Sequence, residues 1–221
     1  MYLFTGIIYQ LGAIDIETIC WPGQITSMIG YLSYPDDFST SSALNCCWSK
    51  DTSNNANSAK YAASGAPAAG YTSGGNPEYN QGFATRKGYL FSSDPLVCFE
   101  FHIPLTHILG FAEYRKDIYG LKHTLTLTRG SDHQALYHNA AVDGKVDVTN
   151  ISWHMPQIQM IPKYLTTMRN ISEQKVIIPV GFRAKSAEQT TLTQTHNFTW
   201  RLSVTGGVKK TKMDYHWISN K

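Results

Sequence analysis

The sequence predicts an all-β chain folded as an antiparallel β-sandwich, and three observations support this. Aromatic residues make up 12% of the 221 residues and stand beside many Thr and Asn, a composition that favours pleated, half-buried surfaces. Several segments alternate apolar and polar residues with a period of two, as strands with one dry and one wet face do. Only 16% of the residues are charged, against about 25% in average soluble domains, so surfaces of low charge are expected.

The strands follow from the alternation. It is regular over residues 97–105, 121–128, 175–183 and 197–204. Weaker strands are expected over residues 3–9, 13–20 and 146–155, which gives about seven in all. Parallel sheets covered on both faces have continuous apolar runs instead, so the pattern favours antiparallel sheets packed face to face. A sandwich of the jelly-roll kind accommodates it.

Two short helices are expected as connectors between strands. Asp132 is placed to cap a helix over residues 134–140. Pro162 suits the first turn of a second helix, which ends near Asn170. The predicted fold is therefore a sandwich with long inter-strand loops and one or two short helices.

A long irregular insertion is expected at about residues 36–87, where Ser, Ala, Asn, Gly and Pro dominate. A stretch of this length inside a domain is usually a binding loop, a disordered segment or a loop ordered by a neighbouring subunit. The residues before it are too few to form a stable domain. We therefore interpret residues 1–221 as one domain with an insertion, rather than as two domains joined by a linker.

Composition excludes several classes of protein. The 19 Lys and Arg against 16 Asp and Glu give a net charge of +3, too diffuse for a sequence-specific nucleic-acid binder. No apolar run reaches the roughly 18 residues of a membrane span. The apolar residues 1–9 lack a basic flank and a cleavage site, so we expect no signal peptide. The cysteines form no CxxC motif and are expected to be reduced thiols: Cys20, Cys46, Cys47 and Cys98.

The sequence offers no convincing catalytic centre. The nucleophile elbow, the phosphate-binding loop, the dinucleotide fingerprint and the HExxH zinc motif are all absent. Ser131, Asp132 and His133 have the residue types of a hydrolytic triad. However, adjacent side chains in an extended or turn segment point apart, whereas a triad needs a particular geometry. We expect no catalytic residue and no enzyme activity.

Two other groups of residues invite a functional interpretation. His102 and His107 stand at a separation that metal ligands use, but no carboxylate or thiolate follows at ligand spacing. Asp36 and Asp37 follow Pro35, where a turn with Asp side chains bonding nearby amides accounts for them better than an acid/base pair. We therefore expect neither a metal site nor a cofactor.

Aromatic residues in or near the predicted loops are the candidates for binding. Tyr and Trp stack on sugars, and they are also the preferred anchors of protein interfaces. We favour a subunit interface, and its candidate residues are Trp21, Tyr31, Tyr34, Trp48, Tyr71 and Tyr79. The alternative is a non-catalytic β-sandwich module that binds glycans or a host protein, as an attachment protein does.

Particular strings point to a family. They are Pro22–Asp37 (PGQITSMIGYLSYPDD), Asn76–Phe83 (NPEYNQGF), Ile103–Phe111 (IPLTHILGF), Tyr119–Leu125 (YGLKHTL), Ile151–Pro156 (ISWHMP) and Phe198–Val204 (FTWRLSV). Through these strings, nearly the whole chain resembles a family of virus-derived proteins in invertebrate genomes. We associate that family with the double-jelly-roll major capsid proteins of Polinton/Maverick-type and adintovirus-like double-stranded DNA viruses.

The resemblance implies a structural capsid subunit of the viral jelly-roll type. It implies two jelly rolls in each polypeptide, three polypeptides in each pseudo-hexameric capsomer, and no catalytic residue. The expected partners are copies of the chain itself, with a penton or minor capsid protein as a further candidate. The expected location is the virion, after synthesis inside the host cell.

The C-terminus departs from the resembling family, whose members run about as far again beyond this chain. Codons for Lys212–Ile218, read from their second base, spell Arg or Lys, then Trp, three residues each Ile or Thr, and Gly. Arg-Trp-Ile-Ile-Ile-Gly is what the resemblance leads us to expect there. We therefore predict that residues 211–221 are an out-of-frame tail, and that the chain is the N-terminal half of a double jelly roll.

Overall fold

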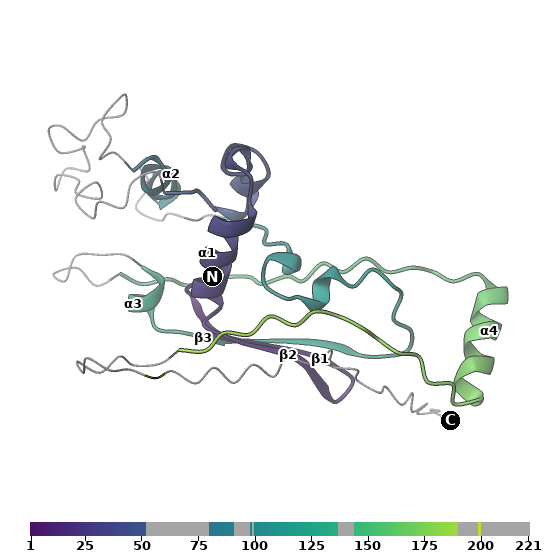
Figure 1. The fold of residues 1–221 in the computed structure, drawn as a ribbon. Helices are drawn as coiled ribbons and strands as arrows, with labels where there is room; N and C mark the ends of the chain where they lie inside the picture. The colour runs from purple at the N-terminus through teal and green to yellow at the C-terminus, as the bar shows by residue number, and fades with distance from the viewer. Residues whose placement is uncertain (52–79, 91–97, 99, 137–143, 190–198, 200–221) are drawn as a thin grey trace, which may run out of the picture. The chain divides into compact units, whose positions relative to one another are not determined.

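The computed structural model describes residues 1–51, 80–90, 98, 100–136, 144–189 and 199 (Figure 1). The chain divides into two compact units. Unit 1 contains residues 1–26 and 108–221, and unit 2 contains residues 27–107. The predicted tail over residues 211–221 and nearly all of the predicted strand over 197–204 lie outside the described residues.

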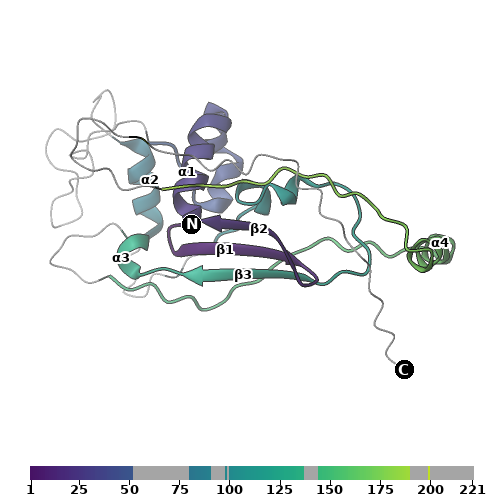
Figure 2. The same cartoon turned by 60° about the horizontal axis from the view of Figure 1, so that its bottom comes forward.

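Unit 1 is built on a three-stranded antiparallel sheet, in which β1 (Phe4–Leu11) lies between β2 (Ile14–Cys20) and β3 (His123–Arg129) (Figure 2). A two-residue turn joins β1 to β2, and its first residue, Gly12, has a φ of 63°. Hairpins with a type II′ turn place glycine at this position, because other residues rarely adopt a positive φ. The strands predicted over residues 3–9, 13–20 and 121–128 are therefore confirmed.

The sheet has one dry face and one wet face, as the alternation predicts. In β1, Ile7, Tyr9 and Leu11 are buried, and the residues opposite them in β3 lie on the same face. The residues of β2 and β3 that pair with the other face of β1 are mostly polar, and they include the exposed Thr18 and Thr126. Core formation therefore requires a second layer over the dry face.

Two segments outside the sheet, residues 108–114 and 180–185, pack against its dry face, and the first of them contains the short helix η5 (Phe111–Glu113). The Phe111 ring lies 5.0 Å from the Tyr9 ring and 5.0 Å from the Phe182 ring. Gly110 is packed so closely that a Cβ on it would overlap the Arg183 carbonyl group. The core of unit 1 lies between this layer and the sheet.

A buried carboxylate joins the two layers. Glu17 of β2 is 3% exposed, and its Oε1 accepts hydrogen bonds from the Gly110 and Lys185 amides at 2.9 and 2.6 Å. Its Oε2 accepts one from the Phe111 amide at 2.9 Å. Three backbone donors that have no strand partner are thereby satisfied by one side chain.

Three predicted strands are corrected by the structure. The described part of 97–105 is irregular and ends in the short helix η4 (Leu105–His107). Residues 146–155 form no ladder, and residues 175–183 contain one isolated bridge residue, Val180. Residues 178–183 alternate in burial, with Val180 buried and Phe182 half-buried between exposed neighbours. A ladder also needs a partner segment, and alternation does not specify one.

Both predicted helices of unit 1 exist, although one is short. Helix α4 (Pro162–Glu173) begins at the predicted proline and extends beyond Asn170. Helix α3 (Asp132–Ala135) is shorter than predicted, and Ser131, not Asp132, occupies its N-cap position. Asp132 instead pairs with Arg129, at 2.7 Å.

The sequence prediction missed two further helices of ten or more residues. Helix α1 (Pro22–Ser33) has proline in its first position and ends before Pro35. Helix α2 (Gln81–Leu90) begins after Asn80, whose side-chain oxygen accepts a hydrogen bond from the Phe83 amide at 3.0 Å. The described helices of ten or more residues thus number three, more than the one or two short helices predicted.

The stretch predicted to be irregular, about 36–87, contains helical structure in its described part. Two short helices, η1 (Asp36–Thr40) and η2 (Ser42–Cys46), lie at its start and α2 lies at its end. The Arg86 guanidinium of α2 donates to the Ser49 carbonyl and to the Asp51 carboxylate. The residues that border the undescribed segment 52–79 are thereby joined within unit 2.

Candidate interaction surface

The exposed aromatic candidates are Trp21 and Tyr31. The Trp21 side chain is 39% exposed, and its φ of 58° is a value that non-glycine residues adopt at a cost. Tyr31 is 44% exposed, and its hydroxyl donates to Asp51 Oδ2 at 3.0 Å. Tyr71 and Tyr79 lie outside the described residues. Trp21 and Tyr31 therefore present ring surface to solvent, and their interface role stays a prediction.

Tyr34 and Trp48, by contrast, are half-buried in an aromatic cluster of unit 2. The Tyr34 ring lies 5.0 Å from the Trp48 ring and 4.2 Å from the Phe38 ring. A Cβ on Gly30 would lie 2.8 Å from Trp48 Nε1, so only a glycine leaves room for the indole there. Burial raises the pKa of the Tyr34 hydroxyl to about 12. These two rings hold unit 2 together, which leaves less of their surface for a partner.

This difference predicts opposite consequences for two tryptophan substitutions. Trp48→Ala is expected to lower the free energy of unfolding of unit 2 by about 3 kcal/mol, because it empties the aromatic cluster. Trp21→Ala is expected to cost less than about 1 kcal/mol, because much of that side chain is already in water. Chemical denaturation of both variants checks this. Equal losses of stability would contradict the assignment.

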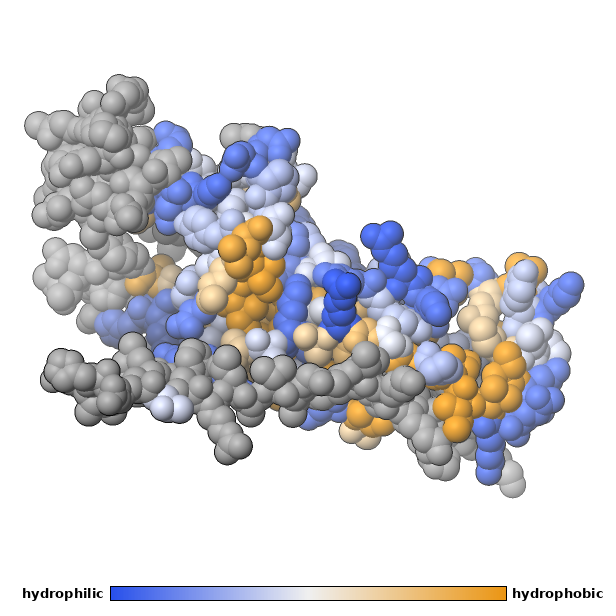
Figure 3. Space-filling model, viewed as in Figure 1, coloured by the Kyte–Doolittle hydropathy of each residue, from blue (hydrophilic) through white to orange (hydrophobic). Residues whose placement is uncertain are grey.

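A group of exposed apolar residues lies on and around α4. We call these residues the α4 surface: Ile158 (69% exposed), Ile161 (57%), Tyr164 (61%), Val176 (47%) and Ile177 (53%). Figure 3 shows apolar side chains at this end of unit 1. Single exposed apolar residues are common, but a group of them marks a surface that binds something.

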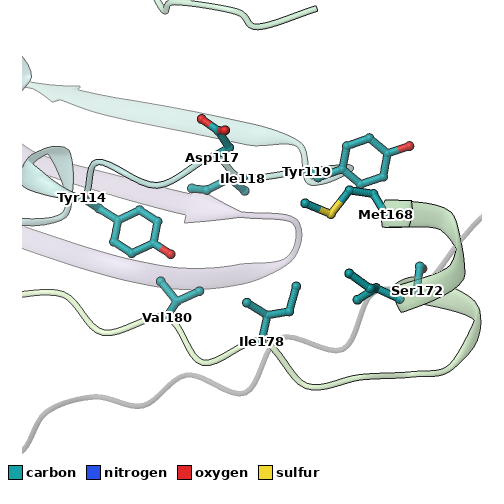
Figure 4. A pocket seen from close by; sticks show the side chains of 9 residues that line it. Tyr114, Asp117, Ile118, Tyr119, Met168, Ser172, Ile178 and Val180 are labelled. Atoms are coloured by element: carbon teal, nitrogen blue, oxygen red, sulfur yellow. The ribbon is translucent and has the colours of Figure 1, made fainter. Parts of the chain in front are cut away.

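A small hollow lies under the inner face of α4 (Figure 4). Met168 and Ser172 of the helix face Tyr114, Ile178 and Val180 across it. Its volume is about 40 Å³, far below the several hundred Å³ of a small-molecule site. The Ser172 hydroxyl is buried without a hydrogen-bond partner among the described residues. The hollow has room for water and not for a substrate.

Tyr9 and His123 form a polar pair on the dry face, which also carries Glu17. The Tyr9 hydroxyl lies 2.7 Å from His123 Nδ1, and the Trp153 ring packs edge-on against both rings. Burial raises the pKa of Tyr9 to about 12 and lowers the pKa of His123 below its ordinary 6.5. The pair is therefore held in its neutral form.

The pair predicts a loss of stability in acid. The pKa of His123 is lower in the folded chain than in the unfolded chain, so the unfolded chain binds more protons in acid. The contribution of His123 to the free energy of unfolding is therefore complete above pH 6.5 and is lost as the pH falls. The variant His123→Gln is expected to have a flatter stability profile between pH 7 and about pH 5. Denaturant midpoints measured across this range check it, with exposed His154 as the control position. A wild-type profile no steeper than that of His123→Gln would refute it.

Comparison with known proteins decides the family. A profile described as a double jelly roll-like domain matches residues 88–216, more than half of the 221 residues. The chain belongs to the double jelly roll-like domain family. No curated protein and no solved structure matches the chain.

The double jelly roll-like domain match spans the elements that carry the candidate surface. It includes β3, α4 and the segments 108–114 and 180–185 of the second layer. The small antiparallel sheet, the few helices and this match fit the predicted β-sandwich. None of the helices in the described residues is long and apolar enough to cross a membrane.

The residues weighed for catalysis do not assemble into a site in this double jelly roll-like domain. Asp132 is held by Arg129, which lowers the pKa of the Asp132 carboxyl, and neither Ser131 nor His133 is buried. Within unit 2, the Lys50 ammonium lies 2.8 Å from Asp36 and lowers the pKa of that carboxyl. Asp132 and Asp36 therefore form ion pairs, and Ser131 occupies the N-cap position of α3 without a capping hydrogen bond from its side chain.

The two histidines weighed as metal ligands have other surroundings. The His102 ring lies 3.8 Å from the Glu100 carboxylate, and the His107 ring packs 5.0 Å from Tyr34. Across the ranges that the structure describes, no three His, Cys, Asp or Glu side chains gather in a way that would hold a metal ion.

Sequence reasoning missed Glu17 and the α4 surface. Glu17 lies opposite Tyr9 on the dry face. A register shift between Tyr9 and Gln10 interrupts the period of two in the pairing, so the alternation in the sequence does not place Glu17 on that face. The α4 surface left a weaker signal, since Ile158, Ile161 and Tyr164 are large apolar residues close together in the sequence; the first two precede the helix, and Ile161 has an extended backbone.

Proposed function

We propose that this chain is a structural subunit of a virus shell, similar to the major capsid proteins of Polinton/Maverick-type or adintovirus-like viruses. The match of residues 88–216 to the double jelly roll-like domain carries the proposal. Low charge and the strings that resemble that viral family support it. In this proposal the chain binds copies of itself through lateral contacts, with trimeric capsomers in the intact protein and a penton or minor capsid protein as a further partner.

The proposed role is not catalytic, and its location is the virion. A shell subunit functions by binding other copies of itself, and the cores of protein interfaces are poor in Lys, Glu and Asp. A content of 16% charged residues suits such surfaces. The ion pairs formed by Asp36 and Asp132 give these candidates a structural role.

The α4 surface is the best candidate for a lateral contact with a second copy. Ile158, Ile161 and Tyr164 each expose more than half of their side-chain area, and large apolar side chains of this kind anchor protein interfaces. The occupant follows from the family, because a shell subunit binds copies of itself.

Two substitutions on one helix test the proposal. Tyr164→Glu places a charge in the α4 surface and is expected to weaken self-association about tenfold or more. Thr166→Glu makes the same change in charge at an exposed polar position on the opposite side of α4 and is expected to preserve association. Light scattering after size-exclusion chromatography measures both.

A wild-type chain that stays monomeric at about 50 µM would overturn the proposal, since even weak self-association becomes visible at such concentrations. A glycan-array signal from that monomer would favour the alternative attachment role. If Tyr164→Glu associates as strongly as the wild type, the α4 surface does not take part in the contact between copies.

We further propose that the reading frame shifts near Thr211 and truncates a longer protein. The codon argument for Lys212–Ile218 supports this. The encoding DNA tests it: the alternative frame after Thr211 is expected to continue into a second strand-rich region of about the same length. A stop codon shortly after that point would refute the shift.

A further inference from the structure

Helix α4 has little of the packing that stabilises helices in folded chains. An isolated helix of about 12 residues is marginal in water, and burial of an apolar face normally supplies its stability. No residue of α4 is buried, and the apolar side chains of Leu165, Met168 and Ile171 are only half-buried. The hollow of about 40 Å³ borders Met168 and Ile171, so this inner row is incompletely packed (Figure 4).

The two ends of α4 also lack the residues that stabilise helix termini. Ile161 occupies the N-cap position, where an apolar side chain accepts no hydrogen bond from the amides of the first turn. Just beyond the C-terminus, Lys175 has a φ of 51°, in the left-handed region that glycine usually supplies after a helix. Both termini therefore cost free energy that a polar N-cap residue and a glycine would avoid.

Two further features weaken the helix from within. Thr166 and Thr167 are β-branched, and their hydroxyls bond carbonyl groups four residues earlier in the helix. The Ser172 hydroxyl lies buried at the hollow with no hydrogen-bond partner among the described residues, and such a group is costly. Sequence, termini and packing thus agree that α4 has a low local stability.

We propose that α4 is marginally stable in the isolated chain and that binding of a second copy to the α4 surface orders it. The identity of this occupant rests on the proposed shell function. The α4 surface has residues before, on and after the helix, such as Ile161, Tyr164 and Val176. A partner that covers all three holds both ends of α4 in place, so association and helix formation stabilise each other.

The coupling has a consequence for the dissociation constant of self-association. When α4 is formed in only a fraction of the free molecules, the apparent affinity falls with that fraction. A substitution on the inner side of α4 that changes helix stability therefore changes association without touching the partner. Ser172 is the suitable position, because alanine there favours the helix and glycine disfavours it, while both remove the unpaired hydroxyl.

Hydrogen exchange of the full chain tests the stability of α4. In the monomer, at low concentration, the amides of residues 166–173 are expected to be at least about tenfold less protected than those of β1. At concentrations where the chain associates, their exchange is expected to slow about tenfold or more, whereas that of β1 changes little. In the monomer, Ser172→Ala is expected to be more protected over these residues than Ser172→Gly.

Light scattering of the same samples tests the coupling. The Kd of self-association is expected to be about threefold or more lower for Ser172→Ala than for Ser172→Gly. The matched pair is Ser131→Ala and Ser131→Gly, at an exposed position of unit 1 that precedes α3. These two control variants are expected to have equal Kd values.

The outcomes that contradict this inference differ from those that contradict the shell function. Protection of residues 166–173 equal to that of β1 in the monomer would overturn the inference while the chain still associates. Equal Kd values for the two Ser172 variants, or α4 protection that stays constant as the chain associates, would show that association is not coupled to α4. A chain that stays monomeric at about 50 µM would instead overturn the shell function, and with it the occupant named here.

Discussion

Glu17→Gln is expected to lower the free energy of unfolding of unit 1 by about 2–3 kcal/mol. The carboxylate accepts three backbone donors, two at Oε1 and one at Oε2. A glutamine amide offers one accepting oxygen, and its NH₂ group turns a donor toward another donor. In one orientation the Phe111 amide loses its partner, and in the other Gly110 and Lys185 lose theirs. Denaturant unfolding measures the loss.

Asp15→Asn is the matched control for this substitution. Asp15 lies on the same strand, but it is exposed and bonds only to the Gln10 side chain among the described residues, at 2.5 Å. Its replacement is expected to change stability by less than about 0.5 kcal/mol. If Glu17→Gln is tolerated as well as Asp15→Asn, Glu17 does not join the two layers.

Gly110→Ala is expected to cost about 2–3 kcal/mol by forcing the layers apart. A methyl group at this position overlaps the Arg183 carbonyl, which is backbone and has little freedom to move. The shift also draws the Gly110 amide away from Glu17 Oε1. Denaturant unfolding of the variant, compared with the wild type, measures the effect.

Gly181→Ala supplies the control within the same layer. A methyl group on Gly181 meets no atom within 4 Å, so this change is expected to be neutral or slightly stabilising. Equal destabilisation by the two alanines would show that loss of glycine flexibility, and not the close approach to Arg183, limits the fold.

The β1–β2 hairpin, β3 and α4 were predictable because their signals are local. Period-two alternation, a glycine at the turn and a proline in the first helical turn each act within a few residues. Helix α1 carries a local signal as well, Pro22 at its start and Pro35 beyond its end, and the β-rich composition obscured it.

The second layer was not predictable in the same way. Gly110, Lys185 and Glu17 are far apart in the sequence, and no local pattern shows that one side chain bonds both backbones. The alternation of residues 175–183 correctly indicated two faces, but alternation does not specify which segment pairs with which.

The sequence indicated which aromatic residues could form the candidate surface, but it did not indicate which of them are exposed. Trp21 and Trp48 look alike in sequence, yet one is exposed and the other lies in the aromatic cluster of unit 2. That difference arises from Gly30, Tyr34 and Phe38, which form the space that Trp48 fills. Burial of this kind is a property of the packed unit, so residue type alone does not reveal it.

The central claim, that this chain is a self-associating shell subunit, is tested most directly by single-particle electron microscopy of the purified chain. The account predicts oligomers in which copies meet through lateral contacts that include the α4 surface, whereas three-fold capsomers are expected of the intact, longer protein. A uniform population of isolated monomers, at concentrations where shell subunits associate, would contradict it.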